Sequence, residues 1–255
     1  MSQQTKSALL VDHFLAALDQ ADVVHEPFSH LYVQGMFPDD FYVELLENIK
    51  AVEAYKPLKH KDAMRADGSS TRHVMPLNDE ALAALEERHR QYFDLVREVF
   101  AAPDIKRKLF TLLAPGLRDR IGKADVEDVA AYPKSGLFKD ASGYKISPHK
   151  DVATKLVTTQ FYLPPDDSQK SFGTSLYTRN WVGRLAREWN KVASKKVQEF
   201  QHLKTFPFVP NSGYAFVVGK KSWHGREEIP AGKGDRMSLM NIYFDRANVP
   251  FYDTK

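Results

Sequence analysis

The stretch KLVTTQFYL at residues 155–163, followed by PPDD at 164–167, decides the fold class. It is short, rich in β-branched and aromatic residues, and closed by a turn signal, which predicts a β-strand. Segments of the same kind lie at residues 126–132, 214–218 and 236–244. Short strands separated by turns predict a β-sandwich or barrel in this part of the chain.

The first half of the chain has a different pattern. Apolar residues recur every three or four positions over residues 6–20, and a second amphipathic segment follows Pro38, which predicts two helices. Further expected elements are a strand at 28–33, helices at 79–101 and 104–114, and a helix stop near Pro115-Gly116. We therefore expect a single domain over 1–255, with a mostly helical N-terminal region at 1–125, a β core at 126–246, and a helical or irregular insertion at about 179–202.

Composition limits the classes of function. The 255 residues are 43% hydrophobic and contain no cysteine, which excludes disulfides, thiolate metal sites and a cysteine nucleophile. The net charge is only +3, and basic pairs such as Lys195-Lys196 are scattered, so no nucleic-acid partner is expected. No apolar run approaches the length of a membrane span, so we expect a cytoplasmic protein without a membrane partner.

The motif His149-x-Asp151 places an imidazole and a carboxylate two residues apart. In an extended segment, residues two apart share a face, so the two side chains can converge. By itself the motif is also compatible with an ordinary surface pair. His224 follows the strand expected at 214–218, beside Gly225, where it can be presented into a pocket. Two histidines and one carboxylate form the facial triad of non-haem Fe(II) oxygenases.

Arg236 and Ser238 lie twelve and fourteen residues after His224 and share one face of an expected strand. The following positions on that face, including Met240 and Ile242, are apolar. A guanidinium on such a face needs an anionic partner, because an unpaired buried charge is costly. A carboxylate ligand would satisfy Arg236 in a bidentate manner, with a further hydrogen bond from Ser238. A carboxylate of the protein itself is the alternative partner.

The order and spacing of these motifs resemble the Fe(II)/2-oxoglutarate-dependent oxygenases, in particular the prolyl-hydroxylase-like branch and its bacterial members. The segments at 131–133, 143–144, 155–164 and 173–177 are also similar to that group, and the resemblance covers about residues 126–246. It implies a double-stranded β-helix, or jelly roll, packed against the N-terminal helices.

The resemblance also implies the roles of particular residues. His149, Asp151 and His224 would bind Fe(II), Arg236 and Ser238 would bind the distal carboxylate of 2-oxoglutarate, and O₂ would be the oxidant. Tyr132 would hydrogen-bond the cosubstrate, although a core tyrosine is an equal alternative. Halogenases of this family lack the metal carboxylate, so the presence of Asp151 favours hydroxylation.

The substrate is less well defined by the sequence. A small molecule is expected, with Arg72 as a contact if the substrate is anionic, and Trp223 as either a wall of the site or a packing residue. The polar stretch at 57–75 is either a substrate lid or a surface loop. The alternatives to a hydroxylase are a non-catalytic metal- or ligand-binding jelly roll, a desaturase or cyclase, and a protein or nucleic-acid-modifying enzyme of the same family. The oligomeric state does not follow from the sequence.

Overall fold

The computed structural model describes residues 2–180 and 199–251, and its strands form two antiparallel sheets. The strands are β1 Asp22–Val24, β2 His30–Gln34, β3 Lys56–Pro57, β4 Arg72–Pro76, β5 Tyr132–Asp140, β6 Ile146–His149, β7 Lys155–Tyr162, β8 Ser175–Arg179, β9 Phe200–Thr205, β10 Ser212–Val217, β11 Trp223–Arg226 and β12 Arg236–Phe244. The large sheet has the order β1-β2-β10-β7-β12-β5-β4-β3, and the small sheet has the order β6-β11-β8-β9.

The path of the chain from β5 to β12 defines the architecture. Successive strands alternate between the large and the small sheet, except for the β8–β9 pair within the small sheet. Strands distributed in this way over two facing sheets make a jelly roll. The expected double-stranded β-helix is therefore confirmed.

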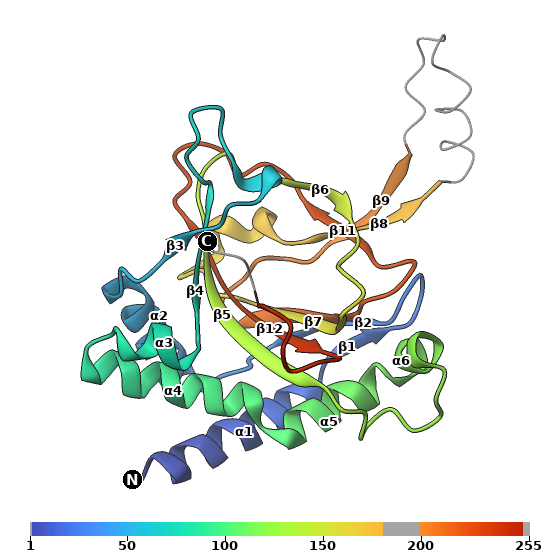
Figure 1. The fold of residues 1–255 in the computed structure, drawn as a ribbon, viewed down its shortest axis with the longest axis horizontal. Helices are drawn as coiled ribbons and strands as arrows, with labels where there is room; N and C mark the ends of the chain where they lie inside the picture. The colour runs from blue at the N-terminus through green and yellow to red at the C-terminus, as the bar shows by residue number, and fades with distance from the viewer. Residues whose placement is uncertain (1, 181–198, 252–255) are drawn as a thin grey trace.

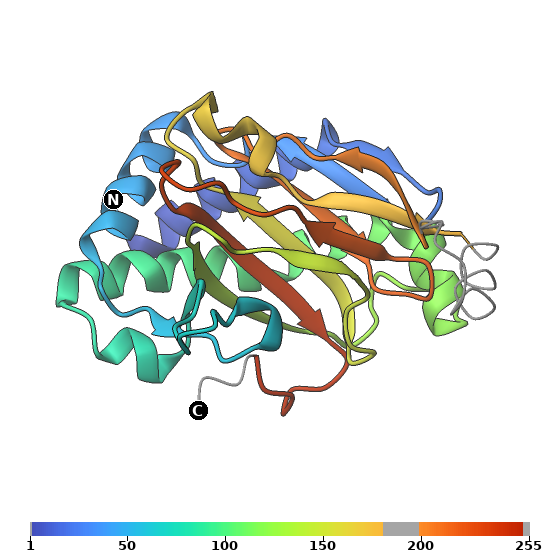
Figure 2. The same ribbon diagram turned by 90° about the horizontal axis from the view of Figure 1, so that it is seen from above.

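Helices cover the outer face of the large sheet (Figures 1 and 2). The helices are α1 Gln3–Asp19, α2 Asp39–Ala51, α3 Asp79–Ala83, α4 Glu87–Ala101, α5 Pro103–Leu112 and α6 Ala114–Ile121, with short 3₁₀ turns η1 Lys61–Ala63 and η2 Asp167–Phe172. Phe161 of β7 and Leu239 of β12 pack with Phe14 and Phe100 of these helices in one hydrophobic cluster. Tyr162, one residue later on β7, belongs instead to a cluster with Phe208 and other aromatic residues. The period of two along each strand thus separates a helix-facing core from the space between the sheets.

The N-terminal region contains strands as well as helices. It contributes β1 and β2 to one edge of the large sheet and β3 and β4 to the other edge. The short strand expected at 28–33 is present as β2, and the polar stretch at 57–75 contains the end of β3, all of η1 and most of β4. Hydrogen bonding to distant strands, rather than local propensity, organises these segments.

Three sequence expectations are corrected. The strand expected at 126–132 lies later, as β5, whose residues Lys134–Asp140 contain no β-branched side chain. The helix expected at 79–101 is two helices, α3 and α4. Pro115 is not the end of the helical segment. It lies in the first turn of α6, where its missing N–H is not needed. The helix instead ends at Gly122, whose φ of +74° is left-handed. Most of the insertion expected at about 179–202 lies outside the described residues, and residues 200–202 belong to β9.

Candidate metal and cosubstrate site

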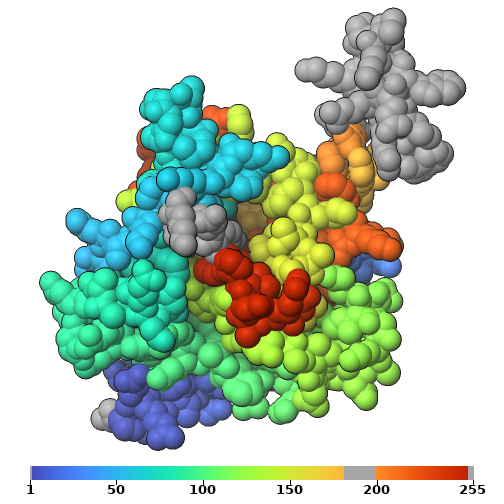
Figure 3. Space-filling view, viewed as in Figure 1, coloured from blue at the N-terminus to red at the C-terminus, as the bar shows by residue number. Residues whose placement is uncertain are grey.

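A cavity of about 440 Å³ opens between the two sheets. In Figure 3 its rim is formed by the cyan 57–75 stretch, the yellow-green segment around β6, and the red C-terminal segment. Residues from both sheets line its interior, including His149, Asp151, Lys155, Gln160, Thr174, Tyr214, His224, Arg226, Arg236 and Met240. The three residues of the expected triad therefore face one space.

The two histidines lie directly opposite each other on paired strands. His149 of β6 and His224 of β11 are partners in the antiparallel register, and their ring centroids are 4.3 Å apart. Nδ1 of His149 is 3.1 Å from the carbonyl oxygen of Ser147, and Nδ1 of His224 is 3.0 Å from that of Ser222. If each Nδ1–H donates to its carbonyl, both Nε2 atoms present a lone pair to the cavity, which is the usual arrangement of a metal-binding histidine.

Gly225 permits the close approach of these strands. A Cβ atom at this position would lie 2.8 Å from the carbonyl oxygen of Ile146 and 3.2 Å from the backbone of Ser147. A larger residue would therefore push β11 away from β6. The glycine beside His224 thus has a steric role in bringing the two imidazoles together.

Asp151 completes the triad just beyond the end of β6. Its Oδ1 accepts a hydrogen bond from Nζ of Lys155 at 2.8 Å, and its Oδ2 accepts one from Oγ1 of Thr158 at 2.7 Å. Burial would raise the pKa of Asp151, but the charge of Lys155 and the other nearby donors hold it well below its ordinary value. The carboxylate is therefore ionised at neutral pH, as a metal ligand must be.

The two histidines are neutral at neutral pH, the form in which an imidazole binds a metal ion. Burial, together with the neighbouring His149, lowers the pKa of His224 to about 4. Burial also lowers the pKa of His149. One donor atom each from His149, Asp151 and His224 lies within 4.8 Å of the others. Two neutral imidazoles and one carboxylate grouped on one side of an open cavity fit an Fe(II)-type ion with free coordination positions.

A cluster of charges lies on the large sheet within the same sandwich. Arg72 of β4, Asp140 of β5 and Arg236 of β12 are directly opposite one another in the register of three adjacent strands. Oδ2 of Asp140 accepts a hydrogen bond from Nη1 of Arg236 at 2.9 Å, and Oδ1 lies 3.2 Å from Nε of Arg72. Arg236 therefore does have a protein carboxylate as partner, the alternative left open by the sequence. Asp140 was not identified by sequence reasoning, and only the strand register reveals it.

The pairing with Asp140 does not use all of Arg236. Its Nε donates to the carbonyl oxygen of Phe172 at 2.7 Å, whereas Nη2 is buried and has no hydrogen-bond partner among the described residues. Arg236 is 1% exposed and lines the cavity. An orphaned N–H group on a guanidinium at the cavity wall fits an additional anionic ligand.

Ser238 and Tyr132 differ from their expected positions. Ser238 is fully buried, and its Oγ accepts a hydrogen bond from Gln160, which itself lines the cavity in place of Ser238. Tyr132 lies at the first residue of β5, is 42% exposed, and is not among the described residues that line the cavity. The structure therefore places Gln160, rather than either of these residues, at the cavity wall.

Of the two expected substrate contacts, only Arg72 faces the cavity. Besides its ion pair with Asp140, it donates to the hydroxyl of Tyr144 and lies over the ring of Phe138. Trp223 precedes His224 on β11 and so points to the opposite face, where its ring packs against Phe200. The packing interpretation of Trp223 is thus the better one. The 57–75 stretch contributes Leu58, Lys59, His60 and Ala63 to the cavity, and its motion as a lid stays a prediction.

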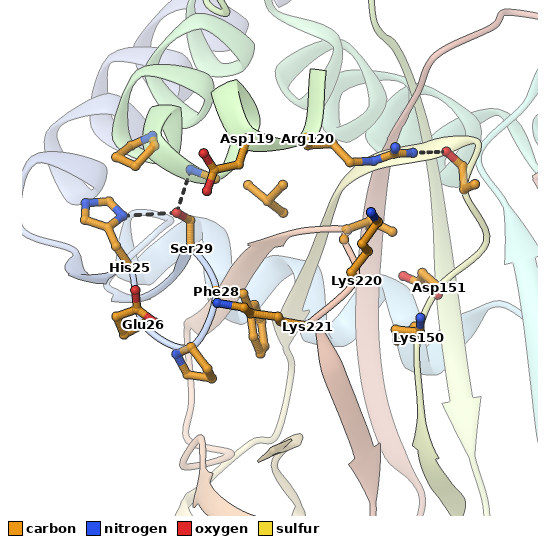
Figure 4. A pocket seen from close by; sticks show the side chains of 17 residues that line it. His25, Glu26, Phe28, Ser29, Asp119, Arg120, Lys150, Asp151, Lys220 and Lys221 are labelled. Carbon is orange, nitrogen blue, oxygen red and sulfur yellow. Dashed lines mark hydrogen bonds between the residues drawn. The ribbon is translucent and has the colours of Figure 1, made fainter. Parts of the chain in front are cut away.

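A second cavity of about 640 Å³ adjoins the metal-site segment (Figure 4). It is lined by Lys150 and Asp151 but by neither histidine of the triad. Its other cations, Lys220 and Lys221, are exposed on a surface turn, and Arg120 on α6 donates to the carbonyl oxygen of Ala153. Although it is the larger cavity, it is lined by neither histidine of the triad, and its lysines lie on an exposed turn, so we assign the chemistry to the smaller one.

No protein-family model and no curated protein matches this chain. Similar solved structures include the non-haem α-ketoglutarate-dependent epimerase SnoN from nogalamycin biosynthesis, with 13% identity, 93% of this chain and 84% of that chain covered, and a TM-score of 0.49. A Pseudomonas putida prolyl-4-hydroxylase has 13% identity, coverages of 93% and 100%, and a TM-score of 0.49. HygX from Streptomyces hygroscopicus, solved with nickel and 2-oxoglutarate, has 12% identity, coverages of 84% and 82%, and a TM-score of 0.49.

SnoN is an α-ketoglutarate-dependent epimerase that has also been solved with Fe³⁺ and α-ketoglutarate, and HygX was solved with nickel and 2-oxoglutarate. At such identities, function is argued from the residues of the cavity. Within the described residues, no helix is both long enough and apolar enough to cross a membrane.

Proposed function

We propose that this protein is an Fe(II)- and 2-oxoglutarate-dependent dioxygenase that hydroxylates an unactivated C–H bond of a small molecule. The observation that carries the proposal is the convergence of His149, Asp151 and His224 in one cavity with the partly unsatisfied guanidinium of Arg236. The first group offers three facial ligands, and the second offers an anchor for a carboxylate.

Residues of the triad and their neighbours would have distinct roles in binding the metal. The Nε2 atoms of His149 and His224 and the carboxylate of Asp151 would hold Fe(II), with Lys155 and Thr158 orienting that carboxylate. With 2-oxoglutarate and O₂, the iron supplies oxidation of a C–H bond, and the cosubstrate leaves as succinate and CO₂.

The remaining cavity wall would position the substrate and exclude water. Apolar side chains form one sector of it, among them Met240 and Phe244 of β12 and Val249 and Phe251 of the C-terminal segment. An apolar sector next to the metal ligands limits the access of water to the reacting centre. It also favours a substrate that carries an apolar part.

The proposal is tested by the release of succinate from 2-oxoglutarate in the presence of Fe(II) and O₂, first without added substrate and then with candidate small molecules. His224→Ala should abolish the release, while the matched variant His202→Ala, on the exposed strand β9, should retain it. Binding of metal and 2-oxoglutarate without any succinate release would favour the non-catalytic jelly roll instead. Desaturation or ring formation would be recognised from the product, since both also release succinate.

A further inference from the structure

Arg226 is a buried cation that sequence reasoning did not single out. It is the last residue of β11, two positions after His224, and it is 5% exposed. Among the described residues, its Nε and Nη2 atoms have no hydrogen-bond partner, and no ion pair is formed by its guanidinium. The carboxylate of the adjacent Glu227 accepts hydrogen bonds from Ser175 and Tyr177, and it forms no ion pair with Arg226 among the described residues.

Arg226 and Arg236 approach the same space from opposite sheets. β11 belongs to the small sheet and β12 to the large sheet (Figure 1), and both arginines line the cavity. Both also contact Phe172: Cζ of Arg226 lies 5.2 Å from its ring centroid, and Nε of Arg236 donates to its carbonyl oxygen. Among the described residues, three buried nitrogen atoms of these two arginines therefore have no hydrogen-bond partner, namely Nε and Nη2 of Arg226 and Nη2 of Arg236.

The charge balance of this cluster is incomplete. Among the described residues, Asp140 is the carboxylate that pairs with Arg236, and it also pairs with Arg72. A fold that buries like charges side by side is less stable unless an anion offsets them. A carboxylate is suited to this because its two oxygens offer about four acceptor positions.

We propose that Arg226 and Arg236 form a two-sheet clamp for a single carboxylate, and that its occupant is the distal carboxylate of 2-oxoglutarate. The inference rests on the proposed function, in which the 2-oxo acid end of the same molecule lies at the triad. A carboxylate on the primary substrate is the other source of the same chemistry, and the experiment separates the two. Arg226 would then favour the binding of 2-oxoglutarate, which has two carboxylates, over that of a 2-oxo acid with only one.

The test measures the dissociation constants of 2-oxoglutarate and pyruvate by calorimetry under anaerobic conditions, with Mn(II)-loaded protein. Pyruvate keeps the 2-oxo acid end but lacks the distal carboxylate. The variants are Arg226→Gln, Arg226→Lys and Arg236→Gln, and Arg107→Gln on helix α5, which is exposed, is the matched control. The melting temperature of each protein is recorded without metal or ligand.

We expect Arg226→Gln to weaken 2-oxoglutarate binding by roughly ten- to hundredfold, as for the loss of a hydrogen-bonded charge, with pyruvate binding changed by less than about twofold. Arg226→Lys should recover part of the loss, because it keeps the charge without the fork. The ligand-free melting temperature of Arg226→Gln should be unchanged or higher, since the variant removes an unpaired buried charge. If Arg226 had only a structural role, Arg226→Gln would instead lower the ligand-free melting temperature.

Two results would overturn the clamp while leaving the proposed function in place. In the first, Arg226→Gln binds 2-oxoglutarate as tightly as the parent protein does, whereas Arg236→Gln no longer binds it. Arg226 would then bind another anion, such as one on the substrate. In the second, Arg226→Gln weakens pyruvate and 2-oxoglutarate equally and lowers the ligand-free melting temperature. If the parent protein binds no 2-oxoglutarate at all, the proposed function and the clamp are both wrong.

Discussion

Replacing Asp140 with asparagine tests the charge cluster between the sheets. Asp140 is fully buried on β5 and lies between two arginines, with its oxygens 2.9 Å from Nη1 of Arg236 and 3.2 Å from Nε of Arg72. Asp140→Asn keeps the size of the side chain and removes its charge. The two arginines, with Arg226 nearby, would then share a buried region without the carboxylate that now offsets them.

The expected loss of stability is large for a single-atom change. Removing one partner of a buried ion pair costs about 3–5 kcal/mol, because the remaining charge stays buried. For a chain of this size, each kcal/mol lowers the melting temperature by about 2–4 °C, so a decrease of about 6–20 °C is expected. The amide oxygen of asparagine still accepts one hydrogen bond, which favours the lower part of this range.

The assay is thermal unfolding of the metal-free protein, followed by calorimetry or circular dichroism. Asp235→Asn is the matched control, since Asp235 pairs with Lys139 but is about 40% exposed, and an exposed pair contributes only about 0–1 kcal/mol. In the proposed site, saturating 2-oxoglutarate should restore part of the melting temperature of Asp140→Asn, because it returns an anion to the cluster. A decrease no larger than that of Asp235→Asn would refute the view that Asp140 holds the two arginines together.

Three further predictions concern the metal site and the effect of pH. Gly225→Ala should abolish the increase in melting temperature on adding Mn(II), because a Cβ would meet the backbone of the neighbouring strand 2.8 Å away; a normal increase would contradict this steric role. Lys155→Met should lower the melting temperature of the metal-free protein but enlarge the increase caused by Mn(II), because the metal then becomes the main counter-charge of Asp151. If the increase caused by Mn(II) were unchanged, Lys155 and Asp151 would not form an ion pair. Burial lowers the pKa of His30 below 6.5, so the unfolded chain takes up this proton first and stability falls as pH decreases below about 6.5. His30→Gln should flatten this dependence in urea titrations at several pH values, whereas His202→Gln on the exposed β9 should not.

The sequence was sufficient for the features that depend on local periodicity. The β-branched and aromatic residues of 155–163 and 236–244, with turn signals around them, predicted strands, and β7 and β12 are the strands found there. The spacing of His149 and Asp151 predicted that these two side chains share a face, because this relation holds within a few residues. The link to His224, 73 residues after Asp151, came from the resemblance to the oxygenase family. The structure brings the three side chains together as expected.

Pairing between distant strands was decided only by the tertiary structure. Asp140 and Arg236 are 96 residues apart, and no pattern around either of them indicates that they are opposite in register. Arg226 lies on a strand whose burial depends on the facing sheet, so its missing partners are visible only after the sheets have packed. A sequence period fixes which side chains share a face, but the register between strands far apart in the chain fixes which charges meet. The sequence therefore predicted the candidate metal ligands and the class of fold, and the packing of the two sheets determined how the surrounding charges are balanced.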